Sequence, residues 1–398
     1  MRSIDDITHS IGSRLVLLVA TMGTVLLNTH YLGSEGMGRV ALLQFGLLLV
    51  TGMAGFVAAG AVVYVRRSHK PKDLRGVAYL WCVFSSIAAA SLGVKIGVFP
   101  EEWLYAAGGL GFLQSIVIFH SQLLIASGRI KQNNYLQIIQ TSTLLLAVII
   151  AYLVIDLDTP EGFALALLGA LAITLLFSII TLWGSWDESP TVKSNVGDAR
   201  KLLFVHGTQA QTGSILQLFT NRANLSLLFQ AMGNNAGAGV YSVVYYGVEA
   251  VWTIARAIAP MVNNEVAKAS VRSERMAITS GYLKKTIAFT LPLVVLAYLI
   301  PESVYAWVFG IDGVSAPLRL LAPGMIAGAV SSILAHHLSG VGLHKWNAIT
   351  SGLGLAVLLI VGVFVVPIKS VEDAAIAASC AYVAQACGLF FAWRLEKI

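Results

Sequence analysis

Long apolar runs recur along almost the whole of this sequence, and they constrain its fold more than any other feature. Each run has about 20 residues, the length that an α-helix needs to cross the roughly 30 Å hydrocarbon core of a bilayer. Hydrophobic residues make up 57% of the chain and charged residues only 12%, which lies outside the balance of a soluble globular protein. The chain is therefore predicted to be an integral membrane protein.

Short breaks that are charged or contain Gly or Pro separate twelve such runs. We therefore predict an all-α polytopic membrane protein with twelve transmembrane helices. The predicted spans are 9–31, 38–65, 75–97, 102–127, 133–155, 161–183, 202–231, 238–263, 282–300, 316–341, 346–366 and 372–393.

The lysines and arginines predict the orientation of these spans. Of the 26 basic residues, 20 fall at the two termini and in the even-to-odd connections, and four fall on the opposite side. Because cytoplasmic loops carry the excess of Lys and Arg, both termini of this multi-pass protein are predicted to be cytoplasmic. The net charge of +6 thus follows from topology and favours anionic lipid headgroups, and nothing in it indicates nucleic acid.

The chain divides near its midpoint into two similar halves. Its least apolar internal break runs from residue 183 to 201, and six runs lie on each side. Gly33 after the first run matches Gly233 after the seventh, and GRIKQN from Gly128 matches GLHKWN from Gly342. We predict two pseudo-symmetric six-helix bundles, residues 1–190 and 191–398, around a central cavity, as in transporters built from repeats.

Once the charged residues near the span ends are assigned to the two membrane sides, three remain inside the membrane: Arg222, Glu249 and Arg256. Such residues avoid lipid, so they are expected to face protein or water. Arg222 is expected in the outer third of the membrane, Glu249 near the middle and Arg256 in the inner third. Glu249 and Arg256 are two turns apart, about 10 Å, which is beyond direct pairing unless their long side chains meet partway. A structural Arg222–Glu249 bridge is the alternative interpretation.

Polar residues at helical spacing accompany these charges. Gln217 and Asn224 belong to a polar face of the seventh run, and Arg14 and Asn28 lie on one face of the first. The stripe on the eighth run contains Tyr245, Glu249, Trp252, Arg256 and Asn263. Together these stripes predict a hydrated cavity lined by spans one, seven and eight, although Arg14 also has the option of snorkelling to the cytoplasmic surface. The predicted substrate-binding residues are Arg222, Arg256, Arg14, Glu249, Asn224, Gln217 and Asn28.

Signatures of catalysis and metal binding are missing from the sequence. It has no phosphate-binding GxxxxGK[ST] loop, no HExxH and no GxSxG, and its three cysteines show no CxxC spacing. Asp156-Leu157-Asp158 looks like the DxD of some glycosyltransferases, but it lies in a six-residue turn without an adjoining domain. The isolated histidines are interpreted as packed polar residues. We expect no enzyme, no cofactor and no metal site.

Three stretches, together with the twelve spans in two halves, resemble a known family over essentially the whole chain. They are YLGSEGMGRVALLQ after span one, LLIASGRIKQNN after span four, and NRANLSLLFQAMGNNAGAGVYSVVYYGVEAVWTIARAIAP across spans seven and eight. The family is that of the Wzx-type O-antigen flippases, in the multidrug/oligosaccharidyl-lipid/polysaccharide exporter superfamily. Its pattern often carries an acid two residues after the arginine of span seven, where this chain has Asn224.

The resemblance implies a substrate: a glycan joined through pyrophosphate to undecaprenol, flipped to the outer leaflet by alternating access for lipopolysaccharide or a similar surface polysaccharide. It implies that Arg222 contacts the anionic headgroup. Expected partners are this lipid-linked glycan, the bilayer, and other polysaccharide export and polymerisation proteins; a monomer is expected. One alternative is a multidrug or small-metabolite exporter, whose acidic cluster the first half lacks. The other is a glycan ligase or polymerase, whose large outer loop is missing.

Overall fold

The structure is a computed structural model of the chain that describes residues 4–189 and 198–396, with side chains from residue 16 onward apart from 209 and 210. It contains two compact units, Met1–Thr212 and Gly213–Ile398. The division between them falls inside the helix α7 (Ala199–Met232), about 20 residues after the division at 190–191 that the sequence predicted. About the first four turns of that helix, Ala199 to Thr212, belong to the first unit, and Gln211 Nε2 donates a hydrogen bond there to the carbonyl oxygen of Gly52 at 3.1 Å.

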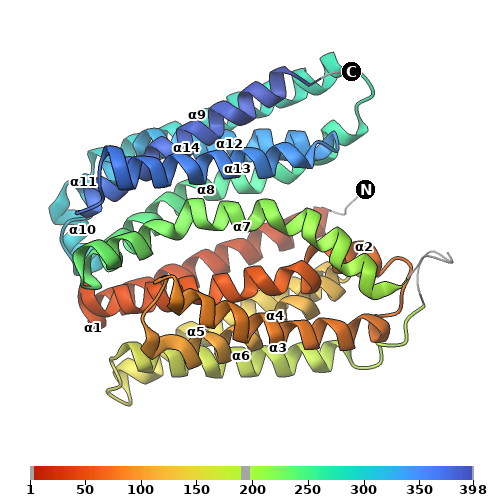
Figure 1. Cartoon of the computed structure of the whole chain (residues 1–398), viewed down its shortest axis with the longest axis horizontal. Coiled ribbons are helices and arrows are strands. Elements are labelled where there is room, and N and C mark those ends of the chain that lie inside the picture. The colour runs from red at the N-terminus through yellow and green to blue at the C-terminus, as the bar shows by residue number, and fades with distance from the viewer. Residues whose placement is uncertain (1–3, 190–197, 397–398) are drawn as a thin grey trace. The chain divides into compact units, whose positions relative to one another are not determined.

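The first unit is a bundle of antiparallel helices (Figure 1). Counting the two arms of α1 separately, because a kink at Gly33 divides it, its described residues contain six helices of membrane-spanning length besides the start of α7. The elements are α1 (Ile4–Ala58), α2 (Gly60–Val65), α3 (Pro71–Lys95), η1 (Glu101–Trp103), α4 (Leu104–Ala126), α5 (Ile130–Leu153) and α6 (Pro160–Leu182).

The second unit, within its described residues, repeats this plan with six long helices, of which α7 begins in the first unit, and three short ones (Figure 1). The tenth predicted span is divided between α11 and α12, and α10 was not predicted. The elements are α7 (Ala199–Met232), α8 (Ala236–Lys268), α9 (Arg272–Leu299), α10 (Glu302–Phe309), α11 (Ser315–Leu320), α12 (Ala322–Gly340), α13 (His344–Ile360), η2 (Val361–Val365) and α14 (Val371–Arg394).

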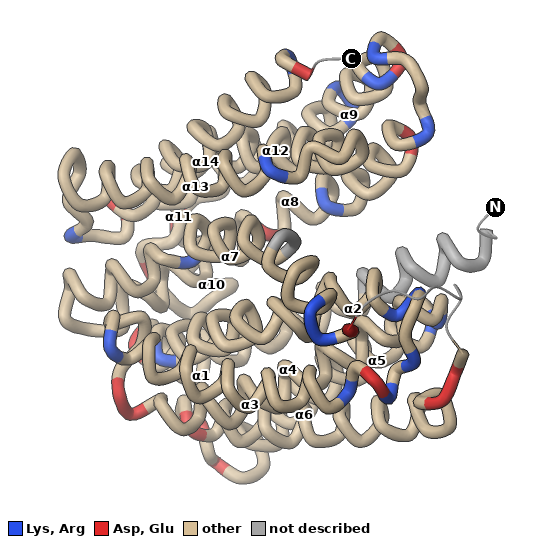
Figure 2. Tube along the Cα trace, turned by 45° about the vertical axis from the view of Figure 1, so that its right-hand side comes forward, with Lys and Arg blue, Asp and Glu red and all other residues tan. Residues whose placement is uncertain are grey.

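Most of these helices have the composition of membrane spans. Among the described residues, eight helical segments are long and apolar enough to cross a bilayer, and one of them, Val16–Val65, covers two predicted spans. Three long helices, α7, α8 and α12, do not meet this criterion. Figure 2 shows where the charges of the helices lie within each unit. Lys, Arg, Asp and Glu gather toward helix ends and connections, and the middles of the helices are free of charge over long stretches. Charges are costly at the bilayer centre, so this distribution suits a membrane bundle.

The glycines that suggested a repeat adopt matching backbone conformations. Gly33 and Gly233, which end the first long helix of each half, have φ of 62° and 66°. Gly128 and Gly342, which follow the fourth long helix, have φ of 74° and 78°. L-residues with a side chain rarely adopt this left-handed region, whereas glycine does so without steric cost. The two pairs therefore terminate helices in the same way in the two units.

Two buried histidines also occupy corresponding places, one in the fourth long helix of each unit. His120 of α4 hydrogen-bonds Tyr79 Oη at 2.7 Å and Ser178 Oγ at 2.6 Å. His337 of α12 hydrogen-bonds Thr279 Oγ1 at 2.6 Å, and both histidines are fully buried. The interpretation of these histidines as packed polar residues is confirmed, because each ring satisfies its nitrogens by linking neighbouring helices.

An acidic residue closes each bundle after its sixth long helix. In the first unit Glu188 pairs with Arg66 at 3.2 Å. In the second, Glu396 pairs with Arg275 at 3.1 Å and with His337 at 2.7 Å. Each carboxylate thus ties the end of the last helix to an earlier part of the same unit. The sequence offered no signal for these pairs, because their members are far apart along the chain.

A second carboxylate organises the connection between α10 and α11. Glu302, the first residue of α10, accepts hydrogen bonds from the backbone N–H groups of Gly313, Val314 and Ser315 at 2.7, 3.1 and 2.8 Å. Partial burial alone would raise the pKa of Glu302, but the hydrogen bonds from Ser315, Val314 and Gly313 outweigh it and hold that pKa below its ordinary value. The ionised carboxylate therefore stabilises this turn.

Glu302→Gln is expected to loosen the turn at neutral pH by roughly 1 kcal/mol, because hydrogen bonds to a charged acceptor are lost at a partly exposed site. Because the pKa of Glu302 is lower in the folded protein, its ionised carboxylate stabilises the fold at pH values above the unfolded pKa, about 4.3. This stabilisation is lost as the pH falls through the folded pKa. Hydrogen exchange of the Gly313–Ser315 amides, corrected for intrinsic rates, should accelerate in the wild type on acidification. The variant should show no such step, and Asp312→Asn serves as the neighbouring control. Identical pH profiles for wild type and Glu302→Gln would refute the role of this carboxylate.

Candidate functional site

The candidate site lies on α7 and α8, which are joined by a short turn at Gly233. Arg222 projects from α7, and Glu249 and Arg256 from α8. The Nη2 atom of Arg222 is 3.4 Å from Oε2 of Glu249, and Nη1 of Arg256 is 3.5 Å from Oε1 of the same carboxylate. The structure thus brings together the three charged residues predicted inside the spans. Two guanidinium groups share one carboxylate, which leaves one formal positive charge in excess.

The pairing of Glu249 with Arg256 realises one of the two alternatives that the sequence left open. The two residues are seven positions apart, so they lie two turns apart on one face of α8. Their backbones are separated by about 10 Å, so direct pairing required the long side chains to meet partway. The structure shows that the extended arginine side chain closes this gap, because it reaches along the helix surface to the carboxylate. The Arg222–Glu249 bridge, given as the structural alternative, is also present.

Aromatic rings support both arginines. The Cζ atom of Arg222 lies 4.1 Å from the centroid of the Tyr245 ring, and Cζ of Arg256 lies 5.6 Å from that of Trp252. A cation within about 6 Å of an aromatic face is attracted by the ring quadrupole. We call Arg222, Tyr245, Glu249, Trp252 and Arg256 the arginine cluster. The predicted stripe of α8 contains four of its five members.

Trp252 is held in place by α12 and α14. Its Nε1 donates a hydrogen bond to the carbonyl oxygen of Met325 at 2.8 Å, and its ring lies 5.2 Å from that of Tyr382. Gly328 of α12 faces the same ring, since a Cβ there would come within 2.2 Å of Trp252. The aromatic wall beneath Arg256 is therefore rigid. Tyr382 was missed in the sequence, because α14 is distant along the chain and no local pattern marks this tyrosine.

The members of the cluster differ in accessibility. The side chain of Arg222 is 13% exposed, that of Glu249 27% and that of Arg256 47%. Arg256 is consequently the group that a ligand would meet first, and Arg222 is the inner, more constrained cation. Because a charged side chain within a membrane helix avoids hydrocarbon, the open side of the cluster is expected to face water or a polar ligand.

Gln217 and Asn224 occupy a different environment from the predicted hydrated cavity. Gln217 Oε1 accepts a hydrogen bond from Ser351 Oγ of α13 at 3.0 Å and another from Gln385 of α14. Asn224 is fully buried and donates to Tyr241 Oη at 2.7 Å and to the backbone of α14. This part of the polar face packs against α13 and α14, since polar side chains in membrane bundles find partners on adjacent helices. With its side chain enclosed, Asn224 offers no surface for the predicted substrate contact in this conformation.

The two candidates on span one lie in the first unit. Asn28 is 1% exposed, and its Oδ1 accepts a hydrogen bond from Tyr152 Oη at 2.8 Å, so it too is engaged in helix packing in this conformation. Arg14 belongs to α1, but its side chain falls outside the described residues. Its proposed contact with substrate stays a prediction.

Comparison with known proteins identifies the fold. No family model matches the sequence, and no curated protein matches it. Among solved structures, an inward-facing multidrug resistance MATE family transporter of the MOP superfamily matches with a TM-score of 0.68 at 13% identity, covering 96% of this chain and 93% of that one. The outward-facing form of such a transporter matches with a TM-score of 0.65 at 14% identity, with the same coverage.

A third neighbour is a MOP superfamily transporter from Pyrococcus furiosus, described by the reverse polarity of its binding pocket. It matches with a TM-score of 0.59 at 14% identity over 96% of this chain and 95% of that one. MATE transporters have twelve transmembrane helices in two bundles. The predicted fold class is thus confirmed: the chain is a multi-pass, all-α membrane protein of two six-helix bundles. At this level of identity, the comparison speaks to the fold alone.

Proposed function

We propose that this protein is an alternating-access transporter that flips an undecaprenyl-pyrophosphate-linked oligosaccharide, such as an O-antigen repeat unit, from the cytoplasmic to the outer leaflet of the bacterial inner membrane. The observation that carries the proposal is the arginine cluster, in which Arg222 and Arg256 share the single carboxylate of Glu249. A site with an excess of positive charge within membrane helices favours an anionic ligand.

The chemistry of a pyrophosphate suits this cluster. It presents several negatively charged oxygens, and arginine offers planar, permanently charged donors that hydrogen-bond such groups in pairs. Glu249 forms ion pairs with both arginines. A pyrophosphate carries more charge than one carboxylate, so we propose that it displaces Glu249 from the more exposed Arg256 first and then engages Arg222. Glu249 would then act as an internal counter-ion that a ligand phosphate replaces at the two arginines.

The fold is compatible with this function. Its solved neighbours include inward-facing and outward-facing forms of one kind of transporter, which supports alternating access as the transport mechanism. The reverse polarity of the binding pocket in the Pyrococcus furiosus neighbour is described as suggesting a different function for that transporter. The lipid-linked oligosaccharide flippases that the sequence resembles belong to the same superfamily. We further propose that both termini are cytoplasmic and that other polysaccharide export and polymerisation proteins are its partners.

A second candidate function is multidrug export. Two of the neighbours described above are multidrug resistance transporters, and the Glu249 carboxylate retains 27% exposure, so a cationic compound has an acidic group to approach. Against this, the carboxylate is already neutralised by two guanidinium groups. A cation would have to displace Arg256 and accept the nearby charge of Arg222. The electrostatics of the cluster therefore favour the anionic substrate.

Transfer of a fluorescent polyprenyl-pyrophosphate glycan across the bilayer of reconstituted vesicles tests the proposal. Arg256→Ala is expected to slow the transfer by roughly 10- to 100-fold, because a hydrogen bond between charged groups contributes about 1.5–3 kcal/mol. Arg256→Lys should retain part of the rate, since it keeps the charge and loses the paired donors. Arg319→Ala is the control, because Arg319 also lies over an aromatic ring, that of Tyr298 at 5.7 Å, outside the cluster.

The same vesicles distinguish the two functions. Efflux of ethidium that requires Glu249, with no movement of the glycolipid by the wild type, would establish the drug exporter instead. Wild-type glycolipid transfer in the Arg256→Ala protein would exclude the cluster as the headgroup site.

A further inference from the structure

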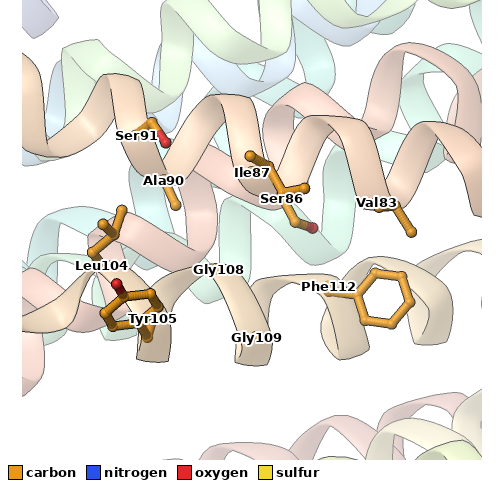
Figure 3. A pocket seen from close by; sticks show the side chains of 10 residues that line it. All are labelled: Val83, Ser86, Ile87, Ala90, Ser91, Leu104, Tyr105, Gly108, Gly109 and Phe112. Atoms are coloured by element: carbon orange, nitrogen blue, oxygen red, sulfur yellow. The ribbon is translucent and has the colours of Figure 1, made fainter.

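Two grooves flank α3 in the first unit, and they differ in charge. One, the α3–α4 groove, has a volume of about 420 Å³ and is lined by side chains of α3 and α4 that include Val83, Ile87 and Phe112 (Figure 3). Its walls are mostly apolar, with the hydroxyls of Ser86, Ser91 and Tyr105 as exceptions, and the described residues that line it include no charged side chain. This groove offers hydrocarbon contact without a site for a charged headgroup.

The other, the α3–α7 groove, lies between α3 and the first turns of α7 and has a volume of about 540 Å³. It is amphipathic along its length. Lys72 and Arg200 lie in the first turns of α3 and α7 and form its basic end. Trp81, Phe84 and Phe204 lie further along the same two helices and form its apolar end. From Lys72 to Phe84 the helix rises about 18 Å, which is close to half the thickness of a bilayer core plus its interface. The groove therefore has the dimensions of one lipid leaflet.

The apolar end of this groove is a preformed aromatic surface. The Trp81 ring lies 5.0 Å from that of Phe204 and 5.2 Å from that of Phe84. Its Nε1 donates a hydrogen bond to the carbonyl oxygen of Met53 at 3.0 Å, which fixes the orientation of the indole. Phe84 is 57% exposed and Leu80, on the same wall, is 75% exposed. Large apolar side chains that stay open beside a structured ring are suited to an acyl chain.

The basic end retains donors for a phosphate. Lys72 Nζ lies 2.5 Å from Oδ1 of Asp187, but an ammonium group has three donors, so two remain. Arg200 is exposed, and its backbone N–H rather than its guanidinium bonds Asp198. The one acid in the lining, Asp73, accepts a hydrogen bond from the backbone N–H of Lys70 and so caps α3. Lys72 and Arg200 both belong to the side predicted to be cytoplasmic.

We propose that the α3–α7 groove binds one anionic phospholipid of the cytoplasmic leaflet, with its phosphate against Lys72 and Arg200 and an acyl chain against Trp81, Phe84 and Phe204. The aromatic floor is the reason for choosing a lipid rather than free phosphate. The proposal is independent of the transported substrate, since the groove and the arginine cluster lie in different units. A lipid bound there would bridge α3 to the first turns of α7, the helix that also carries Arg222.

The test uses the purified full-length protein, delipidated and titrated with phosphatidylglycerol or phosphatidylcholine while its melting temperature is followed. The wild type is expected to respond to phosphatidylglycerol at about tenfold lower concentration than to phosphatidylcholine. Arg200→Gln should remove this preference, and Arg200→Lys should retain most of it. Lys95→Gln, at the other end of the same helix, is the matched control and should behave like the wild type.

Two further measurements separate the lipid site from its alternatives. Asp187→Asn frees Lys72 and should preserve or strengthen the lipid preference, whereas a loss equal to that of Arg200→Gln would mean that the Lys72–Asp187 pair merely stabilises the fold. Inorganic phosphate should produce no comparable shift, and a shift as large as that of the lipid would assign the site to free phosphate. Equal responses of wild type and Arg200→Gln to phosphatidylglycerol would overturn the proposal.

Discussion

Arg222→Ala is expected to lower the affinity for the pyrophosphate-linked glycan by about 100-fold and to abolish surface-glycan restoration in a flippase-deficient bacterium. The substitution removes the inner cation of the cluster, its interaction with the Tyr245 ring and its donors to an anion. Charge-assisted hydrogen bonds and a cation–π contact together account for about 3 kcal/mol, which corresponds to this fold-change. Binding of the glycolipid to detergent-solubilised protein measures the first effect, and complementation measures the second.

A double substitution shows whether Arg222 binds the ligand or only neutralises Glu249. If neutralisation is its role, Arg222→Ala with Glu249→Gln should recover binding, because the unpaired carboxylate is gone. If Arg222 contacts the anion, the double variant should stay defective while Glu249→Gln alone binds at least as well as the wild type. Such a cycle isolates the pairwise contribution. Full restoration of surface glycan by correctly expressed Arg222→Ala would remove Arg222 from the site.

Gly207→Ala is expected to destabilise the first unit by more than about 3 kcal/mol, the largest stability effect that we anticipate for a single methyl group. A Cβ at position 207 of α7 would lie 1.6 Å from the carbonyl oxygen of Phe56 and 2.6 Å from its carbon. Both atoms belong to the backbone of α1, so no side-chain rotation relieves the clash. The start of α7 would have to separate from α1, and apparent melting temperature together with accumulation in the membrane should report the loss.

The matched control is Gly169→Ala in α6, where an added Cβ meets no atom within 4 Å. There the same change should be neutral or stabilise by up to about 1 kcal/mol, because alanine has the higher helix propensity. If the Gly207→Ala and Gly169→Ala proteins have the same apparent melting temperature, the close approach of α7 to α1 does not contribute to stability. Such a result would also count against the lipid site proposed in the α3–α7 groove, because that groove depends on the position of the same first turns of α7.

The fold was largely predictable from local patterns. Each long apolar run became a helix within a few residues of its expected ends, except at α9, which begins ten residues earlier than predicted because its first turns are polar and project beyond the apolar segment. The paired glycines were predictive because a left-handed residue after a helix requires glycine whatever surrounds it. The short helix α10 was missed, since eight residues leave too few turns for a periodic pattern.

The candidate site was predictable only in part. Charge inside a membrane span is conspicuous in a sequence, so Arg222, Glu249 and Arg256 were identified without a structure. Polarity alone, however, does not tell a cavity wall from a helix contact. Asn224 and Asn28 were assigned to a cavity, yet the structure buries both in hydrogen bonds to neighbouring helices. The partners that decide this, Tyr241 and Tyr152, are ordinary apolar-run residues when read along the chain.

The sequence by itself determined that this protein is a helical membrane bundle, where most of its long helices begin and end, and which helices carry charge, because hydrophobicity and backbone conformation act over a few turns of chain. Only the tertiary structure decided that Glu249 pairs with both arginines, that the polar face of α7 packs against α13 and α14, and that α3 and α7 enclose an amphipathic groove. Those features depend on side chains from separate helices meeting in space, and no local pattern encodes which helices become neighbours.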